Sequence, residues 1–281
     1  MVAVGEEQLH VMERGEGQVV LMIHGNPTWG YLWRKVALAL PEAGYRCVMP
    51  DLVGLGLSSK PRLLSAHSLD AHAAWLGDLV QQLDLRDVIL VVQDWGGAIG
   101  SLAFSEQEHR LAGLVVLNTV LMPPREGFKP TAFHRFAQAP VLSDVAFRLL
   151  GFPQNRLHGV QGDPSSIQGT TARAYRYPLR RLLDRAAPLA LARMVPDRLD
   201  HPSIPALERC RDLVTRFHGP TEIVWGRRDP ILGRVLGAIK RMLPQAGVTE
   251  TDAGHFLQEE VPDAIAAAVE RVAQRTRPPS R

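Results

Sequence analysis

The sequence predicts an α/β fold: a mostly parallel sheet with helices on both faces and one helical insertion. Short runs that are apolar on both faces alternate with amphipathic helical patterns, which is typical of parallel strands covered on both sides. This alternation stops at about residue 122 and resumes at about residue 221. With 281 residues, 46% of them hydrophobic, the chain is long enough to bury a large core.

The elements on either side of the insertion follow one another in a regular order. Before it we expect strand 19–23, helix 32–40, strand 46–49, helix 72–83, strand 88–92, helix 98–108 and strand 114–117. After it we expect strand 222–225, helix 232–243, strand 248–251 and helix 262–273. Since parallel strands run the same way, their C-terminal ends share one edge, where open α/β sheets bind ligands.

The insertion differs in composition and in hydrophobic pattern from the rest of the chain. Prolines recur throughout residues 122–220, aromatic residues are frequent, and no clear strand pattern is present. This predicts short, proline-broken helices forming a lid between the sixth and seventh strands of the sheet. The predicted division is therefore a core of residues 1–121 and 221–275, a helical lid of residues 122–220 and a disordered tail of residues 276–281.

Composition excludes several classes of protein. The net charge is +3, and no basic stripe is interleaved with aromatics, so we expect no nucleic-acid partner. We expect no membrane insertion and no signal peptide, because no apolar run is long enough to span a bilayer and residues 1–10 have no apolar segment. Cys47 and Cys210 lack metal or redox spacing, which favours reduced thiols in a cytoplasmic protein. No phosphate loop, dinucleotide fingerprint or metal cluster is present, so we expect no cofactor and no metal.

The most informative motif is Gln93-Asp94-Trp95-Gly96-Gly97, which lies between a predicted strand and a predicted helix. It resembles the nucleophile elbow of α/β-hydrolases, which is usually built around a serine. Asp94 takes the serine position, and a carboxylate is already ionised at neutral pH. It can displace a leaving group from saturated carbon and form an ester. The alternative is a purely structural role, in which Asp94 only caps the following helix.

An ester on Asp94 needs a general base for its hydrolysis, and His255 is the candidate. It follows the last predicted strand, so it reaches the same sheet edge as Asp94. Asp229, after the preceding strand, is the candidate acid that orients the histidine, although a turn-capping role is the alternative. The other place for this acid, after strand 114–117, holds Asn118 and no acid. The order nucleophile, acid, histidine is that of α/β-hydrolases.

Asn26 and Trp95 are the candidate anion-stabilising residues. Asn26 lies in the loop after strand 19–23, and Trp95 directly follows the nucleophile. In α/β-hydrolases the backbone N–H groups at such positions form the oxyanion hole. Both side chains also carry N–H donors, which could hold a departing anion.

Taken together, these motifs resemble those of haloalkane dehalogenases. The resemblance rests on His24–Arg34 (HGNPTW and LWR), the loop 51–58, QDWGG at 93–97, WGRRDP at 225–230 and DAGHF at 252–256. It implies the α/β-hydrolase fold with an eight-stranded sheet, a triad of Asp94, His255 and Asp229, and halide binding by Asn26 and Trp95. The implied reaction converts a small apolar haloalkane into an alcohol, a halide ion and a proton.

Three alternatives remain open at this point. The acid at Asp229 together with Asn26 resembles a third dehalogenase subfamily, some members of which decarboxylate β-lactones in olefin synthesis. An epoxide hydrolase would use lid tyrosines as acids, and Tyr175 and Tyr177 are available. A hydrolase-fold binding protein could retain the triad without turnover, because a fold does not fix a function. The sequence does not reveal the oligomeric state.

Overall fold

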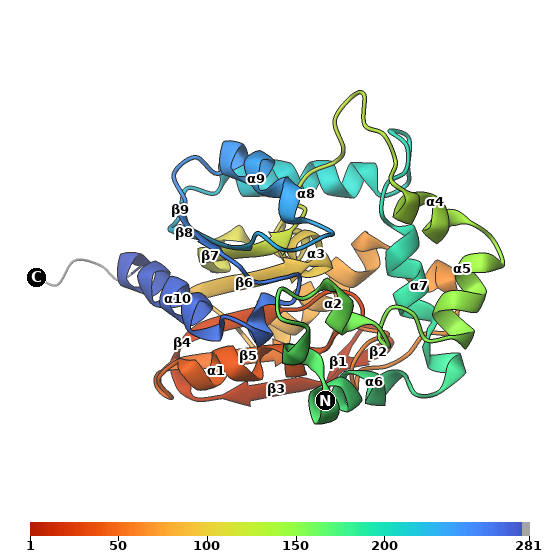
Figure 1. Ribbon diagram of the computed structural model, residues 1–281. Helices are drawn as coiled ribbons and strands as arrows, with labels where there is room; N and C mark the ends of the chain where they lie inside the picture. The colour runs from red at the N-terminus through yellow and green to blue at the C-terminus, as the bar shows by residue number, and fades with distance from the viewer. Residues whose placement is uncertain (277–281) are drawn as a thin grey trace, which may run out of the picture.

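The computed structural model describes residues 1–276, which form a seven-stranded sheet with helices on both faces and a separate two-stranded hairpin (Figure 1). The strands are β1 (Val2–Val4), β2 (Glu7–Leu9), β3 (Val11–Arg14), β4 (Glu16–Ile23), β5 (Ala43–Pro50), β6 (Val88–Asp94), β7 (Leu111–Thr119), β8 (Thr221–Gly226) and β9 (Gly247–Thr251). The α-helices are α1 (Arg34–Ala39), α2 (Leu69–Gln82), α3 (Trp95–Ala103), α4 (Ala132–Gln138), α5 (Leu142–Asp144), α6 (Gly169–Arg176), α7 (Ala186–Arg193), α8 (Ile204–Arg216), α9 (Leu236–Met242) and α10 (Pro262–Thr276).

The seven strands of the large sheet lie in the order β3-β5-β4-β6-β7-β8-β9, and only β3 runs antiparallel to its neighbour. The prediction of eight strands in one sheet was therefore wrong by one strand within residues 1–276. The first segment of the chain instead pairs with itself, β1 with β2, through a turn that contains Gly5 at positive φ. In this sheet the lid lies between the fifth and sixth strands, β7 and β8, rather than between the sixth and seventh.

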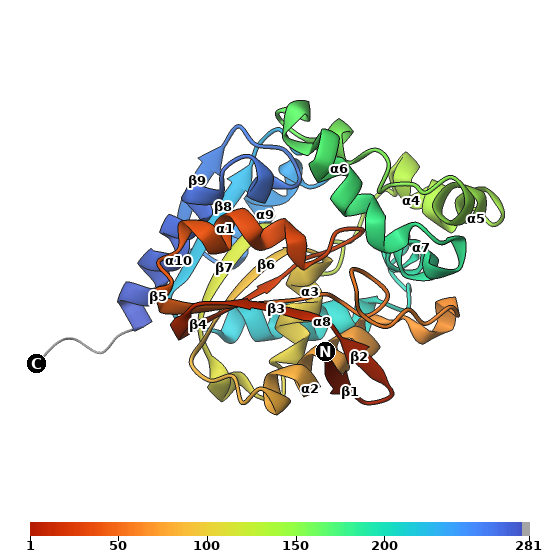
Figure 2. The same cartoon turned by 90° about the horizontal axis from the view of Figure 1, so that it is seen from below.

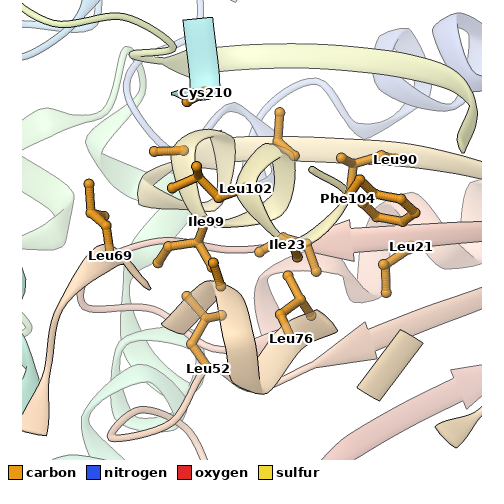
Figure 3. Close-up of a cluster of buried hydrophobic side chains, with 14 of the residues drawn as sticks. Leu21, Ile23, Leu52, Leu69, Leu76, Leu90, Ile99, Leu102, Phe104 and Cys210 are labelled. Atoms are coloured by element: carbon orange, nitrogen blue, oxygen red, sulfur yellow. The ribbon is translucent and has the colours of Figure 1, made fainter. Parts of the chain in front are cut away.

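Two apolar cores hold the helices against the sheet. One lies between the sheet and helices α1 and α10, which pack against each other (Figure 2). The other lies on the opposite face, under α2, α3 and α8. Figure 3 shows part of this second core, where Ile99 and Leu102 of α3 lie near Leu76 of α2 and Ile23 of β4. Strand β6 is buried at nearly every position, and β4 is buried over its second half, 20–23, which explains the apolar runs in both strands.

The predicted lid range contains helices of two kinds. Helices α4 to α7 lie beyond the ends of the strands, at one side of the molecule (Figures 1 and 2). Helix α8 packs against α3, and its Cys210 is fully buried in the core (Figure 3). We therefore propose a lid that ends before α8, near residue 203, rather than at residue 220.

Two further expectations concern helices and termini. Within residues 1–276, no helix combines the length and the apolar character needed to cross a bilayer. The predicted disordered tail, residues 276–281, begins at a residue that forms the last position of α10, Thr276. Its remaining residues, 277–281, lie outside the part of the chain that the structure describes.

Candidate active site

Asp94 occupies a sharp turn between β6 and α3. Its backbone lies at φ 50° and ψ −130°, a conformation that non-glycine residues rarely adopt and that turns the side chain out of the strand. The turn needs glycine nearby, because a Cβ on Gly25 would overlap the Asp94 carboxylate and one on Gly96 would overlap the carbonyl of Ile23. Asp94 makes no side-chain capping bond to α3, which argues against the capping alternative.

His255 links Asp94 to Asp229. Its Nδ1 lies 2.8 Å from Oδ2 of Asp229, and its Nε2 lies 3.5 Å from Oδ2 of Asp94. The side chains of His255 and Asp229 are 2% and 0% exposed, whereas the Asp94 side chain retains 17% exposure. The structure thus brings the three predicted triad residues together, with the nucleophile candidate the most accessible. In this arrangement Asp229 fixes the ring so that Nε2 faces Asp94.

The carboxylate of Asp229 is fixed by two further donors. The side-chain amide of Asn118 donates to Oδ2 at 2.8 Å, and the backbone N–H of Ile231 donates to Oδ1 at 2.7 Å. The bond from Ile231 is the one that a turn-capping aspartate makes. Asp229 therefore both caps its turn and orients His255. Asn118 also bridges to Gly226, accepting from its N–H at 2.7 Å and donating to its carbonyl at 2.9 Å. Asn118, considered from the sequence only as the place of a missing acid, therefore supports the acid that is present.

The charges of the three groups are coupled. Burial opposes the charged imidazolium of His255, but the Asp229 and Asp94 carboxylates outweigh it and raise its pKa to about 10. Burial opposes the charged carboxylate of Asp229, but His255, Asn118 and the Ile231 N–H lower its pKa below the ordinary value. The resting site therefore favours an imidazolium between two carboxylates at neutral pH.

Gln93 is a residue of the site that sequence reasoning missed. It is fully buried on β6, and its Nε2 lies 3.1 Å from the His255 carbonyl and 3.3 Å from His255 Nε2. Its Oε1 is buried without a partner among the described residues. In a strand, side chains alternate between faces, so neighbouring positions 93 and 94 give no sequence signal that both reach the same histidine. The two contacts of Gln93 with His255 join residues 162 positions apart, which only the fold brings together.

Asn26 and Trp95 both lie next to Asp94. The backbone N–H of Asn26 donates to Oδ1 of Asp94 at 2.7 Å. Its side-chain amide donates to the carbonyl of Pro188, on lid helix α7, at 3.0 Å, which leaves a second amide hydrogen free. Trp95 directly follows Asp94 and is half-buried against the core, and its indole N–H has no partner among residues 1–276. The Asn26 backbone thus binds the carboxylate, and the lid orients its side chain.

The lid is tied to the core beside His255 through an ion cluster. The Tyr175 hydroxyl of α6 donates to Glu259 at 2.5 Å, and Arg34 binds the two oxygens of the same carboxylate at 2.6 and 2.9 Å. Lys35 adds a contact of 3.0 Å to Glu259. Tyr175 is fully buried, so its hydroxyl is committed to this carboxylate. Tyr177 is 56% exposed, with Arg180 stacked over its ring.

Comparisons with known proteins identify relatives of this chain. A family model described as the α/β-hydrolase fold matches residues 18–262. Haloalkane dehalogenase 1 of Mycobacterium bovis is 35% identical over 248 residues, 86% of this chain and 79% of that protein. A haloalkane dehalogenase of Mycolicibacterium paratuberculosis is 32% identical over 90% of this chain and 83% of its own length.

Solved structures show the same relationship. The crystal structure of a haloalkane dehalogenase from Agrobacterium tumefaciens superposes with a TM-score of 0.86 at 25% identity, covering 98% of this chain and 96% of that one. The structural match covers nearly the whole chain, so it includes the lid as well as the sheet. This chain belongs to the haloalkane dehalogenase family of proteins with the α/β-hydrolase fold.

Proposed function

We propose that this protein hydrolyses haloalkanes to an alcohol, a halide ion and a proton through an ester on Asp94. One observation carries the proposal: an aspartate replaces the usual serine at the elbow. Its carboxylate makes no capping bond to α3 and lies 3.5 Å from the imidazole of His255. An aspartate there attacks saturated carbon directly, and the histidine serves the hydrolysis that follows. The haloalkane dehalogenase relatives at 32–35% identity support the same reaction.

In the first step, one Asp94 oxygen forms a bond to the substrate carbon while the carbon–halogen bond breaks and its electron pair leaves with the halide. Oδ1 accepts the Asn26 N–H at 2.7 Å, so we assign the attack to Oδ2, which lies 3.5 Å from His255 Nε2. The departing halide needs donors in a site with little water. The free indole N–H of Trp95 and the second amide hydrogen of Asn26 would supply them.

In the second step, water adds to the Asp94 carboxyl carbon while His255 Nε2 accepts its proton. The negative charge that develops on Oδ1 already has the Asn26 N–H at 2.7 Å. Collapse of this intermediate expels the alkoxide, which takes up the proton of the added hydroxyl and leaves as the alcohol, and the carboxylate is regenerated. The proton that His255 accepted is the net proton of the reaction and passes to solvent before the next ester is hydrolysed. Asp229 stabilises the imidazolium that forms during the transfer.

Esterification also prepares the base. The Asp94 carboxylate is one of the charges that raise the pKa of His255 to about 10, and the ester is neutral. Ester formation therefore removes one of the charges that raise the pKa of His255, which favours loss of its proton at the stage that needs a base. The same carboxylate thus controls both steps.

The structure disfavours epoxide opening. That reaction needs a lid hydroxyl that can donate to the epoxide oxygen, but the Tyr175 hydroxyl is buried and donates to Glu259. Tyr177 is on the surface with Arg180 over its ring. Neither tyrosine is placed to act on a substrate bound to Asp94.

Bromide release tests the proposal. Purified protein is mixed with 1-bromobutane or 1,2-dibromoethane, and bromide is followed over time, with Asp94→Asn as the control. Asparagine tolerates the positive φ at this position, so the variant retains the turn and loses only the anionic nucleophile. We expect release by the wild type and none by the variant; equal release by both would contradict the proposal.

A further inference from the structure

The outer surface of the lid carries an exposed aliphatic patch. It is formed by the α5 segment and by the turn before α7, and these segments are joined where the Arg185 guanidinium donates to the carbonyls of Arg148 and Leu149 at 2.9 and 3.1 Å. We call it the lid patch; its members are Val141, Leu142, Val145, Leu149, Leu150, Leu182 and Leu183, with exposures of 38–73%. Helix α5 lies at the end of the molecule opposite the C-terminus in both views (Figures 1 and 2). Exposed aliphatic side chains gathered in this way mark an interaction surface.

The lid that carries the patch is strongly basic. Residues 122–203 contain twelve lysines and arginines against six acidic residues, a net charge of +6, although the whole chain carries only +3. Arg148 directly precedes Leu149, Arg181 directly precedes Leu182, and Arg180 lies two positions before Leu182. None of these three guanidinium groups has an ion pair within residues 1–276. The patch therefore combines apolar side chains with unneutralised positive charge.

We propose that the lid patch docks on the surface of an anionic phospholipid bilayer. Leucines beside arginines that have no acidic partner within residues 1–276 match such a surface, because the aliphatic groups enter the acyl boundary while the guanidinium groups meet lipid phosphates. A symmetric dimer through the same patch would place the arginines of one copy against those of the other. Charge complementarity thus favours a bilayer over a second copy of the chain. The inference does not depend on the reaction proposed above.

Vesicle flotation tests this docking. The full chain is mixed with large unilamellar vesicles of phosphatidylcholine, or of equal parts phosphatidylcholine and phosphatidylglycerol, and the protein that floats with lipid is measured. We expect flotation with the anionic vesicles alone. The variant Arg148→Gln/Arg180→Gln/Arg181→Gln should weaken partitioning by about fivefold for each arginine removed. The variant Leu149→Ser/Leu150→Ser/Leu182→Ser should weaken it at least about tenfold.

Matched controls separate the patch from general surface effects. Leu38→Ser/Leu199→Ser/Val248→Ser removes three aliphatic side chains that are 41–68% exposed outside the patch, and it should float like the wild type. All the changed leucines are exposed, so thermal unfolding should show that each variant remains folded.

Three results would overturn the docking proposal. The first is wild-type protein that floats with neither vesicle type, and the second is flotation that the patch variants leave unchanged. The third is an oligomer, detected by light scattering, that the patch leucine variant alone dissociates; a second copy would then cover the patch.

Discussion

Replacing Tyr175 by phenylalanine tests how the lid is held over the active site. The change removes one hydroxyl from a fully buried ring and leaves the packing of that ring on Tyr31 in place. The hydroxyl donates to Glu259 at 2.5 Å, and Glu259 is the carboxylate that also binds Arg34 and Lys35. The lid thus loses a charge-assisted hydrogen bond to the core.

The size of the loss follows from what remains. A hydrogen bond to a charged group contributes about 1.5–3 kcal/mol. Glu259 keeps both Arg34 bonds, at 2.6 and 2.9 Å, so no buried charge is left unpaired. We therefore expect the free energy of unfolding to fall by about 1.5–3 kcal/mol. For a chain of this size the melting temperature should fall by roughly 3–12 °C.

Urea and thermal unfolding measure the change, with Tyr177→Phe as the matched control. The Tyr177 ring is 56% exposed, and its hydroxyl has no hydrogen bond within residues 1–276, so its loss should change stability by less than about 0.5 kcal/mol. Dehalogenation should persist in both variants. An equal effect of the two changes on stability, or an abolished reaction in a folded Tyr175→Phe protein, would refute the reasoning.

Three other predictions follow from the site. Asn118→Leu removes the amide that holds Asp229 and leaves the Gly226 N–H unpaired. The free energy of unfolding should therefore fall by about 2–4 kcal/mol, and bromide release should slow. An unchanged rate of bromide release would contradict this prediction. Gly25→Ala places a methyl group against the Asp94 carboxylate and should abolish bromide release. The control is Gly159→Ala, whose added methyl group meets open space and should leave bromide release unchanged. Bromide release by the Gly25→Ala variant would contradict the prediction. The pKa of His255 is raised from 6.5 to about 10, so its contribution to stability is complete below about pH 6.5 and is lost as the pH rises towards 10. The difference in unfolding free energy between wild type and His255→Gln should therefore shrink between about pH 6 and pH 9, and a constant difference would oppose the coupling.

The positions of Asp94, Asp229 and His255 were predictable because each follows a parallel strand. Parallel strands end at one edge, so a residue's place after its strand predicts its neighbours without knowledge of the loops. The observed distances of 2.8 and 3.5 Å around His255 confirm that the three side chains meet there. Their catalytic roles, like the halide-binding roles of Asn26 and Trp95, stay predictions that the experiments above address.

Other features depend on tertiary contacts that no local pattern carries. Helix α3 begins at Trp95 and ends at Ala103, rather than spanning 98–108, because the small residues Gly96 and Gly97 let the helix start directly at the turn. The pair of Arg34 and Glu259 joins residues 225 positions apart. The contact between Gln93 on β6 and His255 is likewise a result of tertiary packing. Such contacts require the fold before they can be recognised.

The central claim is that Asp94 forms the ester and His255 hydrolyses it. The most direct measurement is the intact mass of His255→Gln after incubation with 1-bromobutane, followed by peptide mapping. The account predicts a mass increase of one butyl group located on Asp94, with one bromide released per protein molecule and no further turnover. An unmodified, folded variant that releases no bromide, or a butyl group on any other residue, would contradict it.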